Sequence, residues 1–193
     1  VGATDCPLGD PSPDPVPDRR DWWGNPINPN YQGSYAAWSV FAIYSSPDTA
    51  GHQLYLYDTL RCWLHYQDKS FEIKNFVAPA NVVSDPNAAR ITCFVGEGDG
   101  WSNGGHEENI YMNGQLLNTG ASGTALASNN VWNSISNATT PSPDGLDLDT
   151  FVVSGSSGII KPGDSSATVR MNTYQDVWML VYMILSFRSD VTA

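Results

Sequence analysis

A run that is apolar at nearly every position, VWMLVYMILSF, occupies residues 177–187 near the C-terminal end of the chain. A membrane-spanning helix needs about 20 apolar residues, so this run is too short to cross a bilayer. It is rich in β-forming residues and lacks polar/apolar alternation, which is typical of a strand buried on both faces, inside a sandwich or against another subunit. We therefore expect a subunit interface at Val177, Trp178, Leu180, Tyr182 and Ile184.

Short β-prone segments separated by turn-forming residues make up most of the chain after residue 33. They occupy residues 34–46, 53–66, 69–79, 89–98, 110–117, 144–154 and 166–173. The first two are expected to meet across a short Pro/Asp/Gly loop, and Asn113-Gly114 between apolar flanks predicts a tight hairpin turn. Eight to ten short strands without a sustained period of 3.6 residues predict an all-β antiparallel sandwich or jelly-roll.

Residues 1–33 have a different composition, with seven of the 13 prolines of the chain. Proline at this density favours an extended polyproline conformation. We therefore expect an extended Pro/Asp-rich arm over residues 1–33 and a β-sandwich domain over residues 34–193. Trp22 and Trp23 within the arm are expected to cover a surface of the domain or of a neighbour, because large apolar side chains are costly to leave in water.

The chain is strongly acidic, with nine Lys+Arg against 20 Asp+Glu and a formal net charge of -11. This charge opposes binding to nucleic acid and to anionic membrane surfaces, and no membrane insertion is expected. Only 15% of the residues are charged, while Asn, Ser, Thr, Gly and Trp are abundant. This composition is typical of exported proteins and predicts an extracellular or cell-surface location.

Three cysteines, Cys6, Cys62 and Cys93, allow one intrachain disulfide with one thiol left over. Cys6 could pair with either of the other two, Cys62 could pair with Cys93, or one cysteine could bond to another chain, and the sequence leaves these alternatives open. Asn137 begins the single Asn-x-Ser/Thr sequon and is a candidate glycosylation site.

Two groups of acidic residues are candidate calcium ligands. The first, in a Gly-rich loop, comprises Glu97, Asp99, Glu107 and Glu108, and the second comprises Asp144, Asp147 and Asp149. Calcium takes six to eight oxygen ligands from carboxylate-bearing loops, so either group could contribute a share of them. The alternative is an ordinary solvated acidic loop, because the spacing does not match a helix-loop-helix calcium motif.

The sequence carries no catalytic signature, and we predict that the protein is not an enzyme. A glycosidase would need two carboxylates facing each other across a cleft, whereas the adjacent Glu107 and Glu108 would point to opposite faces of a strand. His52, His65 and His106 lack the spacing of a zinc site. A G-x-S-x-G nucleophile motif is also missing.

Tryptophans in loop-like surroundings support a different hypothesis, a carbohydrate-binding module. Exposed aromatic rings can stack on sugars, and the candidates for stacking or for an interface are Trp22, Trp23, Trp101 and Trp132. Trp38, Trp63 and Trp178 lie in apolar segments and are expected in the core.

The order of segments in the second half resembles a domain-of-unknown-function family found in large surface proteins of methanogenic archaea and some bacteria. The similarity lies in an N-G-x-x-L hairpin at residues 113–117, an Asn-x-Trp-Asn-Ser segment at 130–134 and a D-x-D-T-F strand at 147–151. It covers roughly residues 34–186. The resemblance implies an extracellular β-sandwich without assigned chemistry, so no functional residues can be carried over.

Longer members of that family place further strands ahead of the segment that corresponds to residues 34–46, where this chain has its proline-rich arm. A sandwich that lacks strands has an open edge, which the arm of a neighbour could cover by donor-strand addition. We therefore expect a self-associating structural subunit of a cell-surface layer or filament, joined through the arm and apolar edge strands. The alternative is a carbohydrate-binding or adhesive module, with polysaccharide as partner and calcium as cofactor.

Overall fold

The computed structural model describes residues 40, 42–64, 66–96, 107–121, 124–138, 145–174 and 176–189. The chain divides after Val40 into two units, and all the elements below belong to the second, Phe41–Ala193. They comprise strands and two short 3-10 helices, η1 (Pro47–Thr49) and η2 (Ala80–Val83). Among the described residues, no helix is long and apolar enough to cross a membrane.

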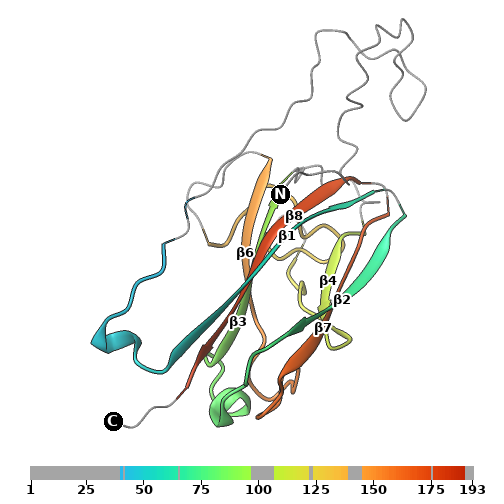
Figure 1. Cartoon of the computed structure of the whole chain (residues 1–193). Helices are drawn as coiled ribbons and strands as arrows, with labels where there is room; N and C mark the ends of the chain where they lie inside the picture. Colours follow the sequence, from blue (N-terminus) through green and yellow to red (C-terminus); the bar gives the residue numbers. More distant parts are fainter. Residues whose placement is uncertain are drawn as a thin grey trace, which may run out of the picture. The chain divides into compact units, whose positions relative to one another are not determined.

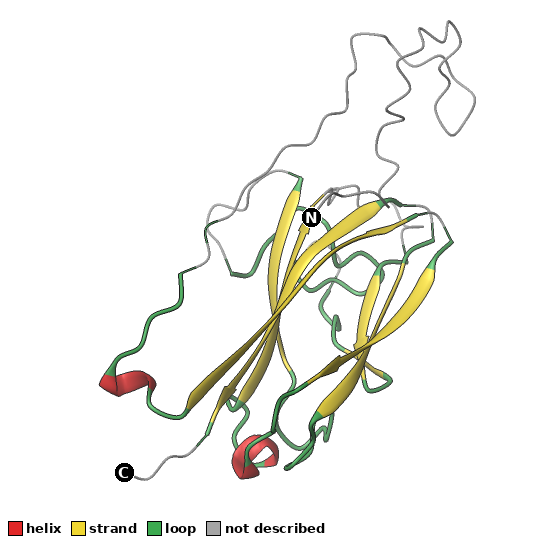
Figure 2. Ribbon diagram, viewed as in Figure 1, coloured by secondary structure: helices red, strands yellow, loops and turns green. Residues whose placement is uncertain are grey.

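Eight strands form two antiparallel four-stranded sheets (Figures 1 and 2). The strands are β1 (His52–Trp63), β2 (Asp68–Lys74), β3 (Ala89–Gly96), β4 (Asn109–Met112), β5 (Gln115–Leu116), β6 (Leu146–Val152), β7 (Ser166–Asn172) and β8 (Trp178–Arg188). One sheet has the order β1-β8-β3-β6 and the other β2-β7-β4-β5. Only the β4–β5 hairpin stays within one sheet, so the chain alternates between layers as in a jelly-roll. The predicted fold class is confirmed.

The predicted hairpin turn joins β4 to β5. Asn113 and Gly114 have φ angles of 48° and 81°, and positive values at both positions are what a type I′ turn requires. The Asn113 side chain fastens the turn to the rest of its sheet, because Oδ1 accepts from the Thr168 N–H at 2.9 Å. Its Nδ2 donates to the Ile159 carbonyl at 2.7 Å.

Three fully buried tryptophans form the centre of the core between the sheets. Trp63 and Trp178 stack with ring centroids 4.3 Å apart and planes inclined by 6°, and Trp132 lies 5.5 Å from Trp178. Trp63 Nε1 donates to the Met171 carbonyl at 3.0 Å, which links the two sheets. The core positions predicted for Trp63 and Trp178 are confirmed.

The C-terminal apolar run forms β8, which is hydrogen-bonded to β1 on one side and to β3 on the other. Its side chains do not all become buried. Five face the core, namely Trp178, Leu180, Met183, Leu185 and Phe187. Those that face outward, including Tyr182 and Ile184, are only half-buried. The prediction that this strand is buried on both faces is therefore wrong within the single chain.

The described part of the first predicted strand, residues 42–46, forms no strand. The expected hairpin with residues 53–66 is absent there, and β1 pairs with β8 instead. In Figure 1 this segment runs clear of both sheets before η1. Local β propensity is satisfied only when a partner strand is available, and the described residues of this chain provide none.

Candidate functional site

The β6 edge of the β1-β8-β3-β6 sheet is covered by residues 136–138 of the same chain. The Leu148 N–H donates to Ser136 Oγ at 2.6 Å, and its carbonyl accepts from the Ala138 N–H at 3.2 Å. Thr150 is paired in the same way, because its N–H donates to Asn137 Oδ1 at 2.8 Å and its carbonyl accepts from Asn137 Nδ2 at 2.9 Å. Side chains thus replace a neighbouring strand, and these outward backbone groups are satisfied.

Two buried carboxyl groups hold this covering segment from the inside. Asp147 Oδ2 accepts from the Ser134 N–H at 3.1 Å, and Asp149 Oδ1 accepts from the Asn137 N–H at 2.9 Å. Burial raises the pKa of Asp147 to about 6. Burial, together with the neighbouring Asp147, raises the pKa of Asp149 to about 8. Near neutral pH Asp149 therefore favours its protonated form, because a charged carboxylate is poorly solvated there, whereas Asp147 is mostly ionised.

The opposite edge of the same sheet, β1, is bare over its first half. Apart from the pairing with β8, the backbone of residues 52–58 makes no hydrogen bond to any described residue. Only the second half receives contacts, since Lys69 Nζ donates to the Cys62 carbonyl at 2.9 Å. An edge strand with free N–H and C=O groups is a template for pairing with another strand.

The segment that precedes β1 carries large apolar side chains in water. Val40, Ile43 and Tyr44 are 78%, 68% and 78% exposed. Adjacent residues of an extended chain point to opposite sides, so exposure of both Ile43 and Tyr44 means that neither side of the segment is covered. Its residues 42–45 also take part in no hydrogen bond within the described structure. The segment is thus strand-like in composition and has no strand partner among the described residues.

Apolar side chains continue over the outer face of the same sheet. Leu54 and Leu56 on β1 and Val152 on β6 are each 49% exposed. The register places Leu56 opposite Ile184 of β8, and Tyr182 of β8 packs its ring 5.2 Å from that of Phe94 on β3. Arg90 and Ser186 separate Val152 from Leu54, so the exposed apolar side chains of β1 gather at the β1 edge of this face.

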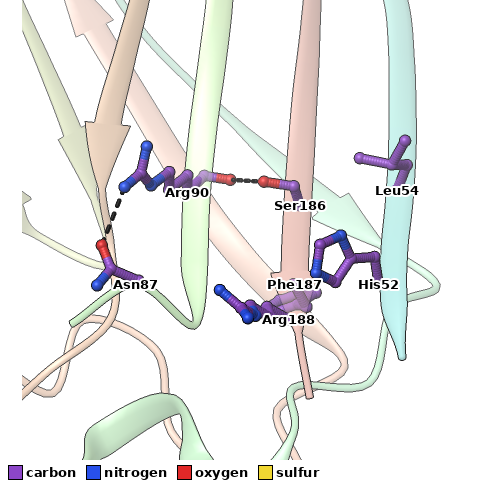
Figure 3. A pocket seen from close by; sticks show the side chains of 7 residues that line it. All are labelled: His52, Leu54, Asn87, Arg90, Ser186, Phe187 and Arg188. Carbon is purple, nitrogen blue, oxygen red and sulfur yellow. Dashed lines mark hydrogen bonds between the residues drawn. The ribbon is translucent and has the colours of Figure 1, made fainter. Parts of the chain in front are cut away.

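A basic hollow lies at the end of this sheet, beside the bare edge (Figure 3). It has a volume of about 350 Å³ and is lined by His52, Leu54, Asn87, Arg90, Ser186 and Arg188. Strand register explains the cluster, because His52 lies opposite Arg188, and Ser186 lies between Leu54 and Arg90. Arg90 Nη2 donates to Asn87 Oδ1 at 3.0 Å. Within the described part of the chain, neither arginine forms an ion pair.

An exposed aromatic pair lies outside this sheet, on the loops β1–β2 and β7–β8. The rings of Tyr66 and Tyr174 are 4.8 Å apart and nearly perpendicular, and the side chains are 69% and 40% exposed. The Tyr66 N–H donates to the Tyr174 carbonyl at 3.0 Å, which holds the two loops together. The pair exposes aromatic surface, and neither tyrosine was among the predicted stacking residues.

The predicted calcium ligands are distributed unevenly. Glu97, Asp99 and Asp144 lie outside the described residues. Glu107 is exposed and Glu108 is fully buried, while Asp147 and Asp149 bind the segment that covers β6. The described part of the chain contains no group of three His, Cys, Asp or Glu side chains that could hold a metal ion. Calcium binding by the loops stays a prediction.

The structure excludes two of the disulfide alternatives. Cys62 is disulfide-bonded, whereas Cys93 is a free and fully buried thiol. Cys62–Cys93 and Cys6–Cys93 pairing are therefore wrong, and Cys6 itself lies outside the described residues. Burial and the neighbouring Asp149 raise the pKa of the Cys93 thiol, which keeps it protonated and unreactive.

The aromatic and interface predictions need correction. Trp132, expected at the surface, is 0% exposed because its loop folds into the core against Trp178 and Phe151, so it cannot stack on a sugar. Trp178 and Leu180 are buried within their own domain and are wrong as subunit contacts. The half-buried Val177, Tyr182 and Ile184 remain candidates.

The remaining tryptophan candidates, Trp22, Trp23 and Trp101, lie outside the described residues. Asn137 is exposed, but the amide nitrogen that a glycan would modify donates to Thr150, so glycosylation would compete with the cover of β6. Glycosylation at Asn137 stays a prediction.

Sequence reasoning missed the basic hollow and the exposed tyrosine pair. The parity of residues along β1, β3 and β8 places His52, Leu54, Arg90, Ser186 and Arg188 on outward positions. That signal was available in the sequence. The order of strands in the sheet was not, and it is this order that brings the two arginines together.

No protein-family model matches the chain, and no curated protein matches it. Among solved structures it is similar to a β-porphyranase of glycoside hydrolase family 86 from the human gut bacterium Bacteroides plebeius, with a TM-score of 0.43 and 12% sequence identity. The match covers 72% of this chain and 20% of that enzyme. A likeness at this level carries no argument about activity, and the fold assignment rests on the strand pairing itself.

Proposed function

We propose that the protein is a non-enzymatic, extracellular structural subunit that associates with copies of itself in a cell-surface layer or filament. The observation that carries this proposal is the presence, in one chain, of a bare β-strand edge and of an exposed strand-like segment. Residues 52–58 provide the edge, and residues 40–45 provide the segment. The edge offers backbone groups without a strand partner among the described residues, and the segment has the composition of a strand that could pair with them.

The energetics favour pairing between copies. Fully burying a Val, Leu, Ile or Phe side chain contributes about 1.5 to 3 kcal/mol relative to leaving it in water. Val40, Ile43 and Tyr44 can gain burial of this kind on a neighbour, while Leu54 and Leu56 lose their remaining exposure. Backbone hydrogen bonds along the β1 edge would add affinity, as in other cases of β-strand addition.

The arrangement favours a chain of subunits over a closed pair. The segment and the edge are different surfaces of one molecule, so a contact between them is heterologous. A subunit that donates its segment to one neighbour still has a free edge for another. Such contacts give rings or open filaments according to the rotation between successive subunits.

The test is the assembly state of the full chain, measured by light scattering after size exclusion and by negative-stain electron microscopy. We expect polymers for the wild type and monomers for the double variant Ile43→Asp, Tyr44→Asp. The matched control is Val77→Asp, Val83→Asp, because these side chains are 61% and 41% exposed at other positions. This control should assemble like the wild type.

A wild-type monomer at all concentrations, or equal assembly of the Ile43/Tyr44 variant, would overturn the proposal. A discrete dimer that does not grow would support strand exchange between two copies and exclude the filament. The measurement therefore separates the existence of the contact from the form of the assembly.

A second candidate, binding of polysaccharide, has one observation in its favour. The exposed Tyr66 and Tyr174 rings could stack on sugars, taking the role that was expected of Trp132. Retardation of the wild type, but not of Tyr66→Ala, on immobilised polysaccharide would support it. The assembly variants described above should leave such retardation unchanged.

A further inference from the structure

The basic hollow at the end of the β1-β8-β3-β6 sheet contrasts with the charge of the whole chain. The net charge is -11, and only nine Lys and Arg residues are present. Two of them, Arg90 and Arg188, converge on the hollow together with His52. Two other cations in the described structure form ion pairs: Lys74 with Glu72 at 2.8 Å and Arg170 with Asp68 at 3.1 Å.

The guanidinium groups of the hollow are available to a ligand. Both arginines are exposed, and among the residues that the structure describes the Arg90 side chain donates to the neutral Asn87 Oδ1 at 3.0 Å. Ser186, on β8 like Arg188, lies opposite Arg90 of β3, and its Oγ donates to the Arg90 carbonyl at 3.4 Å. Figure 3 shows the arginines on neighbouring strands with His52 and Leu54 completing the wall. Arginine recognises carboxylates through paired N–H donors, so this geometry suits a carboxylate ligand.

The chain itself contains a segment of complementary charge. Residues 1–33 carry five Asp and two Arg, separated by prolines. Proline restricts φ, so a segment with this many prolines has less conformational entropy to lose on binding than a proline-poor segment of the same length. Thirty-three extended residues reach about 110 Å, against a radius of gyration of about 15 Å for a domain of this size, so the segment is long enough to reach a neighbouring copy.

We propose that the basic hollow is a carboxylate-binding site and that its occupant is the Asp-rich segment, residues 1–33, of a second copy. The inference rests on the proposed function, because it assigns a second contact between the same subunits. The hollow adjoins the bare edge through His52 and Leu54 of β1, so a neighbouring chain that lies along this edge passes it. The contact also offsets part of the repulsion between copies that each carry a charge of -11.

The test uses the full chain and a fluorescent peptide of residues 1–33 with Cys6→Ser, which prevents disulfide exchange. Binding is followed by fluorescence anisotropy at low and at physiological salt. We expect saturable binding that weakens with salt, and a loss of about tenfold or more for Arg90→Glu, Arg188→Glu. Lys161→Glu, an exposed lysine outside the hollow, is the matched control and should change affinity little. A peptide with every Asp replaced by Asn should not bind.

Several results would overturn the inference: equal binding by the double arginine variant and the lysine control, equal binding of the Asn peptide, or insensitivity to salt. Dextran sulfate is titrated in parallel. If it binds in an arginine-dependent way and the peptide does not, the occupant is an anionic polysaccharide and the assignment to a second copy is wrong. Circular dichroism of each variant checks that the exposed substitutions leave the fold intact.

The two proposals fail separately. Polymers without peptide binding would support the assembly function and show that the basic hollow takes no part in it. Peptide binding by a chain that remains monomeric would keep the site and overturn the structural role.

Discussion

The two edges of the β1-β8-β3-β6 sheet are treated in opposite ways. At β6, the side chains of Ser136 and Asn137 occupy the outward backbone groups of Leu148 and Thr150. At β1, residues 52–58 present the same kinds of groups with no partner among the described residues. The apolar side chains differ correspondingly, because Trp132 next to the β6 cover is fully buried while Ile43 and Tyr44 ahead of β1 are exposed.

The β6 edge makes contacts within the fold, whereas the β1 edge is proposed to make contacts between copies. Changes on the β6 side should alter the free energy of unfolding, because the cover belongs to the fold. Changes on the β1 side should alter association and leave the isolated domain almost unaffected. Three predictions test this division, beginning with the largest expected effect.

Removing the anchor of the β6 cover should have the largest effect. Trp132→Ala deletes a fully buried ring that packs against Trp178 and Phe151, and we expect a loss of about 3 to 5 kcal/mol in the free energy of unfolding. Urea denaturation monitored by circular dichroism measures it. Trp132→Phe should cost less, because it retains an aromatic ring and removes an indole N–H that has no acceptor in the described structure. A loss below 1 kcal/mol for the alanine variant would contradict the anchoring role.

An intermediate effect is expected from the carboxyl groups beneath the cover, and it depends on pH. The pKa of Asp149 is raised from 3.8 to about 8, so the folded state retains a proton that the unfolded state releases. This contribution is fully present below pH 4 and is lost as the pH rises towards 8. We expect wild-type stability to fall steadily across that window.

Asp149→Asn cannot ionise, so it should flatten this decline and exceed the wild type in stability at pH 8. Asp147→Asn should flatten only the lower part of the window, because the pKa of Asp147 is raised to about 6. Urea unfolding at intervals from pH 4 to pH 9 measures both slopes. An unchanged slope in Asp149→Asn would show that the group is solvated in the folded protein.

The smallest change in stability is expected at positions on the outer face of the sheet. Leu56→Lys and Val152→Lys alter two outward positions that are each 49% exposed, on β1 and on β6 respectively. Both should shift the free energy of unfolding by no more than about 0.5 kcal/mol. Only Leu56→Lys should reduce assembly in light scattering. Equal loss of assembly in both variants would mean that the whole outer face, and not the β1 edge, is the contact.

Local sequence signals predicted the elements that depend on neighbours in the chain. Runs of β-forming residues between turn-forming residues located β1 to β4 and β6 to β8, and the Asn113-Gly114 pair identified its turn. The strand and turn predictions are correct because strand propensity and the backbone preferences of a turn are properties of a few consecutive residues.

Features that depend on strand order escaped prediction. Trp132 looked like a loop residue because its neighbours are polar, yet Asn118 and Asn133 satisfy the surrounding backbone and allow the loop to be buried. Residues 42–46 have strand composition but no partner within the described chain, and a single sequence cannot show from which molecule a partner comes. The basic hollow likewise requires β8 to lie between β1 and β3.

The position of β8 also affects how the polypeptide acquires its structure during synthesis. β8 comes last among the strands, yet it separates β1 from β3, so before it emerges only β3 and β6 can pair within that layer. Nearly all the favourable contacts of β1 are postponed until residues more than a hundred positions later have left the ribosome, which slows folding and prolongs the exposure of sticky intermediates. We therefore expect nascent copies to be most prone to associate with one another before β8 has left the ribosome.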